Sequence, residues 1–162
     1  MKVHLKITSL LVVMLFMTGC SKAMVKSDSD PNADLTKLET FYVHKLADDD
    51  DDLDQIIASK LNEFGFQATS GPSPRPGHAV DTIVTYKDRW MWDITMYLLE
   101  IDIEFHDPES DFVFASGKSY RTSLVRKPPE YMIEEVLRDL FAGKVELPEK
   151  EPEETTEENP EE

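Results

Sequence analysis

Two parts of this sequence invite a chemical interpretation, but neither completes a known catalytic or metal-binding pattern. Residues 116–119 contain the Gly-Lys-Ser that ends a phosphate-binding loop, yet Phe112 stands where the motif needs a glycine, and the segment lies inside a predicted strand. The aspartates 48–52 could attract a hard cation, but no EF-hand register in this run supplies both the glycine and the twelfth-position acid. The acidic turn 107–111 fails in the same way. We therefore interpret these segments as a strand, a helix start and a turn.

The other residue types that often carry catalysis are sparse and scattered. His44, His78 and His106 fall on different predicted elements, without the spacing of zinc ligands. The sequence has no Gly-x-Ser-x-Gly nucleophile elbow, and it has one cysteine, Cys20. We expect a protein that is not an enzyme and that needs no metal and no cofactor.

A row of acids is the first candidate for an interaction surface. Glu100, Asp102 and Glu104 alternate with apolar residues between positions 97 and 105, which predicts a strand with one face on a core and the acids on the other. The row could bind a cation or a basic partner. Alternatively, the acids pair with basic side chains on neighbouring strands, at about 0.2–1 kcal/mol per pair; we favour this pairing. The basic candidates are Lys87, Arg89, Lys118 and Arg121.

The two tryptophans, Trp90 and Trp92, are the second candidate. Strand alternation would point both the same way, and charged residues flank them. They could form a recognition patch, because tryptophan is enriched in binding hot spots. They could also cover the end of a small core, which we favour.

The charge of the chain excludes one class of partner. The formal net charge is −16, and the segment 144–162 has nine glutamates against two lysines. We therefore expect no binding to nucleic acid and no overall electrostatic attraction to anionic lipid.

The first twenty residues have the layout of a secretory signal peptide. Lys2 and Lys6 mark a basic start, and residues 7–16 form an apolar run too short to span a bilayer comfortably. The ending Met17-Thr18-Gly19-Cys20 resembles the lipobox of bacterial lipoproteins, with Met17 where that pattern most often has leucine.

This resemblance implies that the signal is removed and that acyl chains such as palmitate are attached to Cys20, which would anchor the protein to a membrane. By the same family's sorting rule, Ser21 in place of aspartate implies the periplasmic face of the outer membrane. An ordinary cleaved signal, or an uncleaved anchor with Cys20 as a bystander, is the alternative.

Four segments follow from composition and periodicity. Residues 1–19 are the signal peptide, and 20–37 are the lipidated N-terminus and a flexible spacer. Residues 38–143 form a single domain, and 144–162 are a disordered acidic tail.

Within the domain, apolar spacing predicts a helix over 52–64, capped by Asp51 or Asp52 and ended by Gly65, and a second from Pro129 that ends before Gly143. Strands are predicted at 40–45, 66–69, 80–92, 97–105 and 112–123. The turn between the third and fourth strands has no glycine or proline to mark it, so residues 87–88 or the neighbourhood of Asp93 remain open.

These elements predict an α+β fold, a two-layer sandwich in which two helices cover one face of an antiparallel meander sheet. The helix ending in Gly65-Phe66 and the acid-led strand 81–84 resemble uncharacterised small α/β lipoprotein families of proteobacterial envelopes. The resemblance implies a fold but no catalytic residues.

We therefore expect a membrane-anchored envelope lipoprotein that acts as a binding or assembly accessory module for an envelope protein or a lipid-like ligand. The alternative is a structural or stress-related lipoprotein without a specific ligand.

Overall fold

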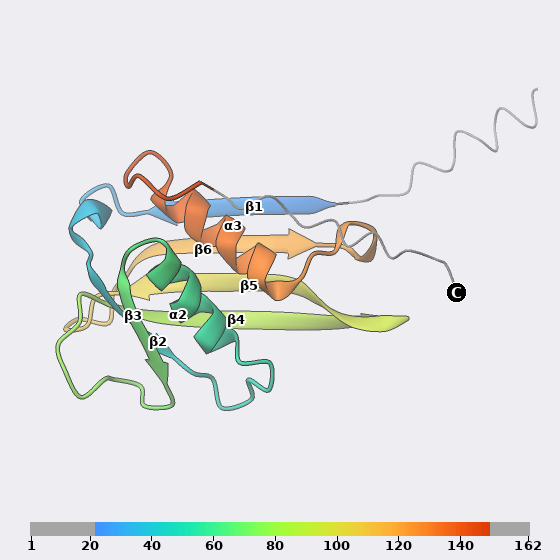
Figure 1. Ribbon diagram of the computed structural model, residues 1–162, viewed down its shortest axis with the longest axis horizontal. Coiled ribbons are helices and arrows are strands. Elements are labelled where there is room, and N and C mark those ends of the chain that lie inside the picture. The colour runs from blue at the N-terminus through green and yellow to red at the C-terminus, as the bar shows by residue number, and fades with distance from the viewer. Residues whose placement is uncertain (1–21, 150–162) are drawn as a thin grey trace, which may run out of the picture.

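The two amphipathic segments form helices close to where their periodicity predicts them. A computed structural model describes residues 22–149 of the chain. In it α2 spans Leu53–Glu63 and α3 spans Pro129–Phe141. Gly65 and Gly143 follow the two helices with positive φ angles of 95° and 70°, a backbone conformation that glycine adopts without steric cost. Both helices lie on the same face of one sheet (Figure 1).

The sheet has six strands in the order β1-β6-β5-β4-β2-β3. The strands are β1 (Ala23–Ser29), β2 (Thr40–His44), β3 (Gln67–Gly71), β4 (Thr82–Asp93), β5 (Thr95–His106) and β6 (Val113–Arg121), and two short 3₁₀ helices, η1 (Leu35–Lys37) and η2 (Ser123–Val125), complete the fold. The α+β class and the two layers are as expected.

The prediction of an antiparallel meander is wrong for two of the five strand pairings. β1, β6, β5 and β4 are antiparallel neighbours, but β2 pairs in parallel with both β3 and β4. The reason is the helix between β2 and β3: a helical crossover returns the chain to the same edge, so the two strands it joins run in the same direction.

Both predicted domain boundaries need correction. The proposed spacer, 20–37, contains β1, which pairs with β6 over seven residues, and η1, whose Leu35 is buried. At the other end, Val145 and Leu147 pack against the core, so the domain extends past residue 143. The signal peptide, Cys20 and the tail beyond residue 149 lie outside the described residues.

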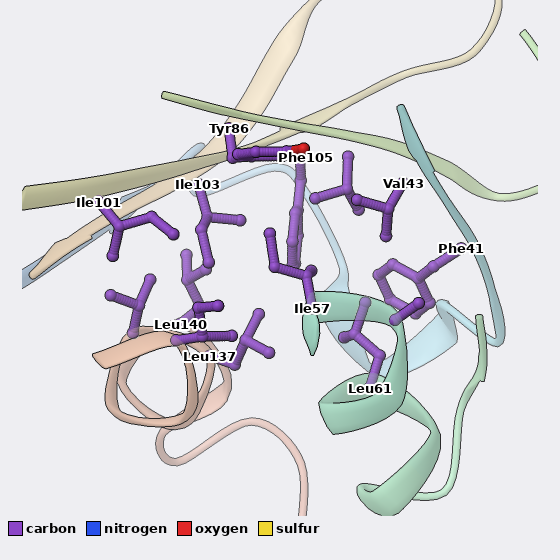
Figure 2. Packing of buried hydrophobic residues seen from close by; sticks show 14 of the residues in the cluster. Phe41, Val43, Ile57, Leu61, Tyr86, Ile101, Ile103, Phe105, Leu137 and Leu140 are labelled. Atoms are coloured by element: carbon purple, nitrogen blue, oxygen red, sulfur yellow. The ribbon is translucent and has the colours of Figure 1, made fainter. Parts of the chain in front are cut away.

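The core lies between the sheet and the two helices. Figure 2 shows Ile57 and Leu61 of α2 and Leu137 and Leu140 of α3 directed at the strands. The strands contribute Phe41, Val43, Tyr86, Ile101, Ile103 and Phe105.

The Gly-Lys-Ser segment has a packing role in this arrangement. It lies within β6, and Gly117 faces α3 so closely that a Cβ atom there would come within 2.7 Å of Val136 Cγ1 and 3.1 Å of Leu140 Cγ. The glycine therefore lets the helix approach the sheet, and the segment is not a phosphate-binding loop.

Replacing this glycine should destabilise the fold. We expect Gly117→Ala to lower the free energy of unfolding by about 1–3 kcal/mol, because the methyl group must displace side chains in a packed core. Urea unfolding followed by circular dichroism measures the change. Gly77→Ala is the matched control, because a Cβ atom at Gly77 meets nothing within 4 Å. Equal stability of the two variants would contradict the close approach of α3.

Candidate interaction surface

The β4–β5 hairpin is longer than the helix layer that covers it. β4 has twelve residues, about 40 Å of extended chain, whereas the thirteen residues of α3 make about 20 Å of helix. Figure 1 shows the hairpin continuing past β6 and the start of α3. The end of the hairpin therefore lies outside the two-layer core.

A register shift interrupts the hairpin just before this end. Arg89 pairs with Glu100 and Trp90 with Leu98, so Leu99 has no partner on β4. The extra residue reverses the alternation, and Leu98, not its odd-numbered neighbours, joins the core cluster. Tyr97 and Leu99 are buried, as the alternation predicts, but they lie outside the core cluster that Leu98 joins.

The two tryptophans have different environments. Trp90 is half-buried, packs against the core and donates its indole N–H to Asp88 at 2.8 Å, so covering the core, as favoured, describes it well. Trp92 lies two residues further along the strand and is 69% exposed. The recognition-patch alternative therefore applies to Trp92 alone.

Other exposed apolar side chains lie at the same end of the molecule as Trp92. We call this group the apolar end and define it as Met91, Trp92, Ile94 and Met96 of the hairpin with Leu124 of η2. Ile94, Met96 and Leu124 are 83%, 59% and 73% exposed. Of the seven large apolar side chains that are exposed among residues 22–149, five belong to this group. Exposed apolar side chains gathered in one place are characteristic of an interaction site.

The hairpin turn itself is strained. The chain reverses at Ile94, next to Asp93, which was one of the two predicted positions. Ile94 has φ 64°, in the left-handed region that β-branched residues rarely adopt. A β-branched apolar residue therefore occupies, almost fully exposed, a position at which glycine or asparagine would be more stable.

The connection from β6 to α3 packs against the turn end of the hairpin. Arg126 donates to Thr95 Oγ1 at 2.9 Å, and its guanidinium lies 5.9 Å from the centre of the Tyr97 ring. A hollow of about 290 Å³ lies between Trp90 and this connection. The first described residue, Lys22, donates its backbone N–H to Thr122 Oγ1 at 3.1 Å, so the chain enters the fold at this same end.

The acidic row on β5 is an internal ion-pair ladder. Lys118 lies 3.0 Å from Asp102 and 3.5 Å from Glu100, Arg89 lies 3.2 Å from Glu100, and Lys87 lies 3.1 Å from Glu104. The hydrogen bond from Lys118 to Asp102 raises the pKa of the lysine, although desolvation opposes it. The favoured prediction of cross-strand pairing is confirmed for these three basic residues. Arg121 instead pairs with Glu135 of α3 at 2.6 Å.

The aspartate run contains a buried hydrogen-bond centre that sequence analysis missed. Asp49 is buried, accepts the Tyr86 hydroxyl at 2.5 Å, and accepts the backbone N–H groups of Asp51 and Asp54 at 3.1 and 3.3 Å. Burial acts to raise the pKa of Asp49, but these hydrogen bonds outweigh it and the net shift is downward. The same burial and hydrogen bond raise the pKa of Tyr86.

Asp49 therefore organises the start of α2 in place of the predicted caps. Asp52 occupies the N-cap position, but its side chain makes no capping hydrogen bond. Its carboxylate instead pairs with Lys45 at 2.6 Å. The sequence signal for a buried acid in this run was Tyr86, 37 residues away on a predicted strand, whose hydroxyl needs a hydrogen-bond partner when it is buried.

The histidines and the remaining acids in the described part of the chain gather into no metal site. Within residues 22–149, no group of three or more His, Cys, Asp or Glu side chains is arranged to hold a metal ion. Nor does this part of the chain contain a helix long and apolar enough to cross a membrane.

Removing the hydroxyl of Tyr86 should destabilise the domain. We expect Tyr86→Phe to lower the free energy of unfolding by about 2 kcal/mol, because Asp49 loses a charge-assisted hydrogen bond in a buried site. Chemical denaturation measures the difference. Tyr120→Phe is the control: Tyr120 is half-buried on β6 and its hydroxyl has no hydrogen-bond partner within residues 22–149. Equal effects would contradict a role for the Asp49–Tyr86 contact.

The same contact predicts an acid-dependent stability. Because the pKa of Asp49 is lower in the folded than in the unfolded state, its contribution is fully present above the unfolded value of about 3.9 and is lost as the pH falls through the folded value. Asp49→Asn should remove this part of the pH dependence in unfolding curves recorded from neutral to acid pH. A variant with an unchanged pH profile would contradict the assignment.

Relieving the strain at Ile94 should stabilise the hairpin. We expect Ile94→Gly to raise the free energy of unfolding by about 1 kcal/mol, because glycine adopts a positive φ angle without steric cost. Thr95→Gly, next to it in β5, should lower it by about 0.5–1 kcal/mol. Thermal unfolding of both variants tests this, and destabilisation by Ile94→Gly as large as that by Thr95→Gly would show that the turn is unstrained.

Comparison with known proteins identifies a shared fold. No family model and no curated protein matches the chain. Two solved structures of the PelC dodecamer from Paraburkholderia phytofirmans align with TM-scores of 0.55 and 0.54, at 17% and 15% identity, over 74% of this chain and 97% of theirs. A DUF4136 family protein from Bacteroides thetaiotaomicron aligns with a TM-score of 0.47 at 10% identity, over 72% of this chain and 93% of that one. The chain therefore has the α+β fold seen in PelC.

Proposed function

We propose that this chain is a non-enzymatic, lipid-anchored module of the bacterial cell envelope. Cys20 carries the acyl chains, and the domain lies at the periplasmic face of the outer membrane. There it acts as a binding or assembly accessory for an envelope protein or a lipid-like ligand. The observation that carries the proposal is the apolar end, where five large apolar side chains are exposed together.

As a binding surface, the apolar end is better supported than the open face of the sheet. The acids Glu100, Asp102 and Glu104 already have lysine and arginine partners, so this row of acids has little unpaired charge with which to select a ligand. Trp92 and Ile94, in contrast, contribute apolar surface that the fold leaves in water. Apolar and aromatic anchors of this kind supply most of the binding energy in interfaces.

A non-enzymatic role agrees with the use of the chemically capable residues. The buried Asp49 and Tyr86 hydrogen-bond each other, and Gly117 serves helix packing. In the hollow of about 450 Å³ at the opposite end, Asp34, Asp81 and Asp107 accept hydrogen bonds from nearby backbone N–H groups. These carboxylates hold loops in place.

Self-assembly is a second candidate. The two PelC structures that share the fold are dodecamers, and the sheet has two edges, β1 and β3, each paired on one side only within residues 22–149. An open strand edge can pair with another copy. Light scattering on the purified chain distinguishes this candidate from a monomeric module. The remaining alternative is a structural or stress-related lipoprotein, which needs no specific contact at Trp92.

The anchor is tested by labelling. Cells that express the full chain or its Cys20→Ser variant are grown with a radioactive fatty acid, and their membranes are fractionated. We expect label on the native chain in the outer membrane and none on Cys20→Ser. Equal labelling of both, or an unlabelled native chain, would refute the anchor. Ser21→Asp is the sorting control: it should keep the label and move the protein to the inner membrane.

A further inference from the structure

We infer that the apolar end is a lipid-contact surface, which lies in the interface of the membrane to which the chain is anchored. The hairpin turn and η2 would insert their side chains among the headgroups and the first part of the acyl chains. This inference rests on the proposed function, since it names the membrane itself as the partner of the exposed apolar residues.

The position at which the chain enters the fold supports this partner. Lys22 is hydrogen-bonded to Thr122, one residue before η2 begins, and β1 starts beside the end of β6. Cys20 is two residues from Lys22, a reach of about 7 Å in extended chain. An acylated Cys20 would therefore hold this end of the domain against the bilayer, and so would an uncleaved apolar run at 7–16.

The residue types fit an interface between lipid and water. Tryptophan is enriched at the level of the lipid headgroups, where its ring is apolar and its N–H is polar. The apolar end combines Trp92 with Met91, Ile94, Met96 and Leu124, and the basic residues Arg126 and Lys127 follow η2 at the same end. Amphipathic surfaces of this composition bury their apolar side chains roughly 5–10 Å into the headgroup region.

The charge of the chain is distributed so that this end can approach a membrane. With Lys22, the segments 89–97 and 121–131 hold five basic and two acidic side chains, although the whole chain has a formal charge of −16. Arg89 and Arg121 are paired with Glu100 and Glu135. With these two partner acids included, the group still holds five basic against four acidic side chains. The carboxylates that line the hollow of about 450 Å³ lie at the other end of the strands, away from the apolar end.

The shape of the end favours lipid over a second protein. A stable protein interface usually involves about 20–30 residues on each side. The apolar end is a narrow projection with five large apolar side chains, beyond the cover of α3. The strained turn also holds Ile94 at the extreme end, 83% exposed. A small protruding group of this kind can enter a fluid lipid layer without a complementary surface.

Fluorescence quenching tests the inference on the full acylated chain. The protein is reconstituted in vesicles of phosphatidylethanolamine with a minor fraction of phosphatidylglycerol, with or without bromine atoms on the acyl chains near the headgroup. Trp90→Phe leaves Trp92 as the one tryptophan, and Trp92→Phe leaves Trp90. We expect bromine to remove most of the Trp92 emission and much less of the Trp90 emission, because Trp90 packs against the protein core.

Two further variants separate the turn from the rest of the surface. Ile94→Asp places a charge at the turn in a residue type that tolerates a positive φ angle, and it should abolish the quenching of Trp92. Phe112→Asp, at an exposed phenylalanine at the opposite end, should leave it unchanged. Equal loss in both variants would contradict insertion of the hairpin turn.

Flotation of the vesicles reports the anchor independently. Protein that floats with the vesicles but shows an unquenched Trp92 would overturn the inference and leave the proposed function standing. Protein that neither floats nor is quenched would overturn both. Trp92 that is shielded by a second copy or by another protein, and not by lipid, would also be unquenched in floating vesicles.

Discussion

The rise per residue in strands and helices sets the limits of this structure. A strand covers about twice the length of a helix with the same number of residues, so α2 and α3 cannot cover the whole β4–β5 hairpin. The core forms where the helices reach, and the remaining hairpin projects with its apolar residues uncovered. Close packing of α3 on the sheet at Gly117 fixes where that cover lies.

The directions of the strands place the entry of the chain and the hairpin turn at one end of the molecule, and the carboxylate-lined loops at the other. β1 enters beside the end of β6, so the segment that precedes Lys22 leaves next to η2 and the hairpin turn. The opposite end carries the carboxylates of Asp34, Asp81 and Asp107, which are bound to their own loops. Between the two ends, the acids of β5 form ion pairs with lysine and arginine side chains of the neighbouring strands. An anchored protein with this arrangement would present its apolar end to the membrane and its acidic end to the periplasm.

Sequence patterns predicted the elements better than their connections. Helical periodicity located α2 and α3 within a residue or two, and alternation identified the paired face of Glu100, Asp102 and Glu104. The parallel pairing of β2 was missed although a strand, a helix and a strand in succession are the signature of a crossover. β1 was missed because an edge strand with four polar residues in seven has little apolar pattern to detect.

The sequence identified Trp90 and Trp92 as candidates but could not tell which of them is exposed. Both tryptophans lie on one strand with the same spacing from charged neighbours, and sequence alone gives them the same environment. The difference comes from where α3 begins relative to the hairpin, which is a tertiary property. The sequence left the turn open between two positions, because the residue with the left-handed backbone, Ile94, is not a turn former.

Hydrogen exchange on the anchored full chain tests the central claim most directly. Exchange is compared between protein in vesicles and protein released into detergent-free buffer by removal of the acyl chains. The account predicts slower exchange in vesicles at the hairpin turn around Ile94 and at η2, with no change in the loop that contains Asp107 and Phe112. Protection at that loop with none at the turn would show that the other end of the molecule faces the membrane, and would contradict the account.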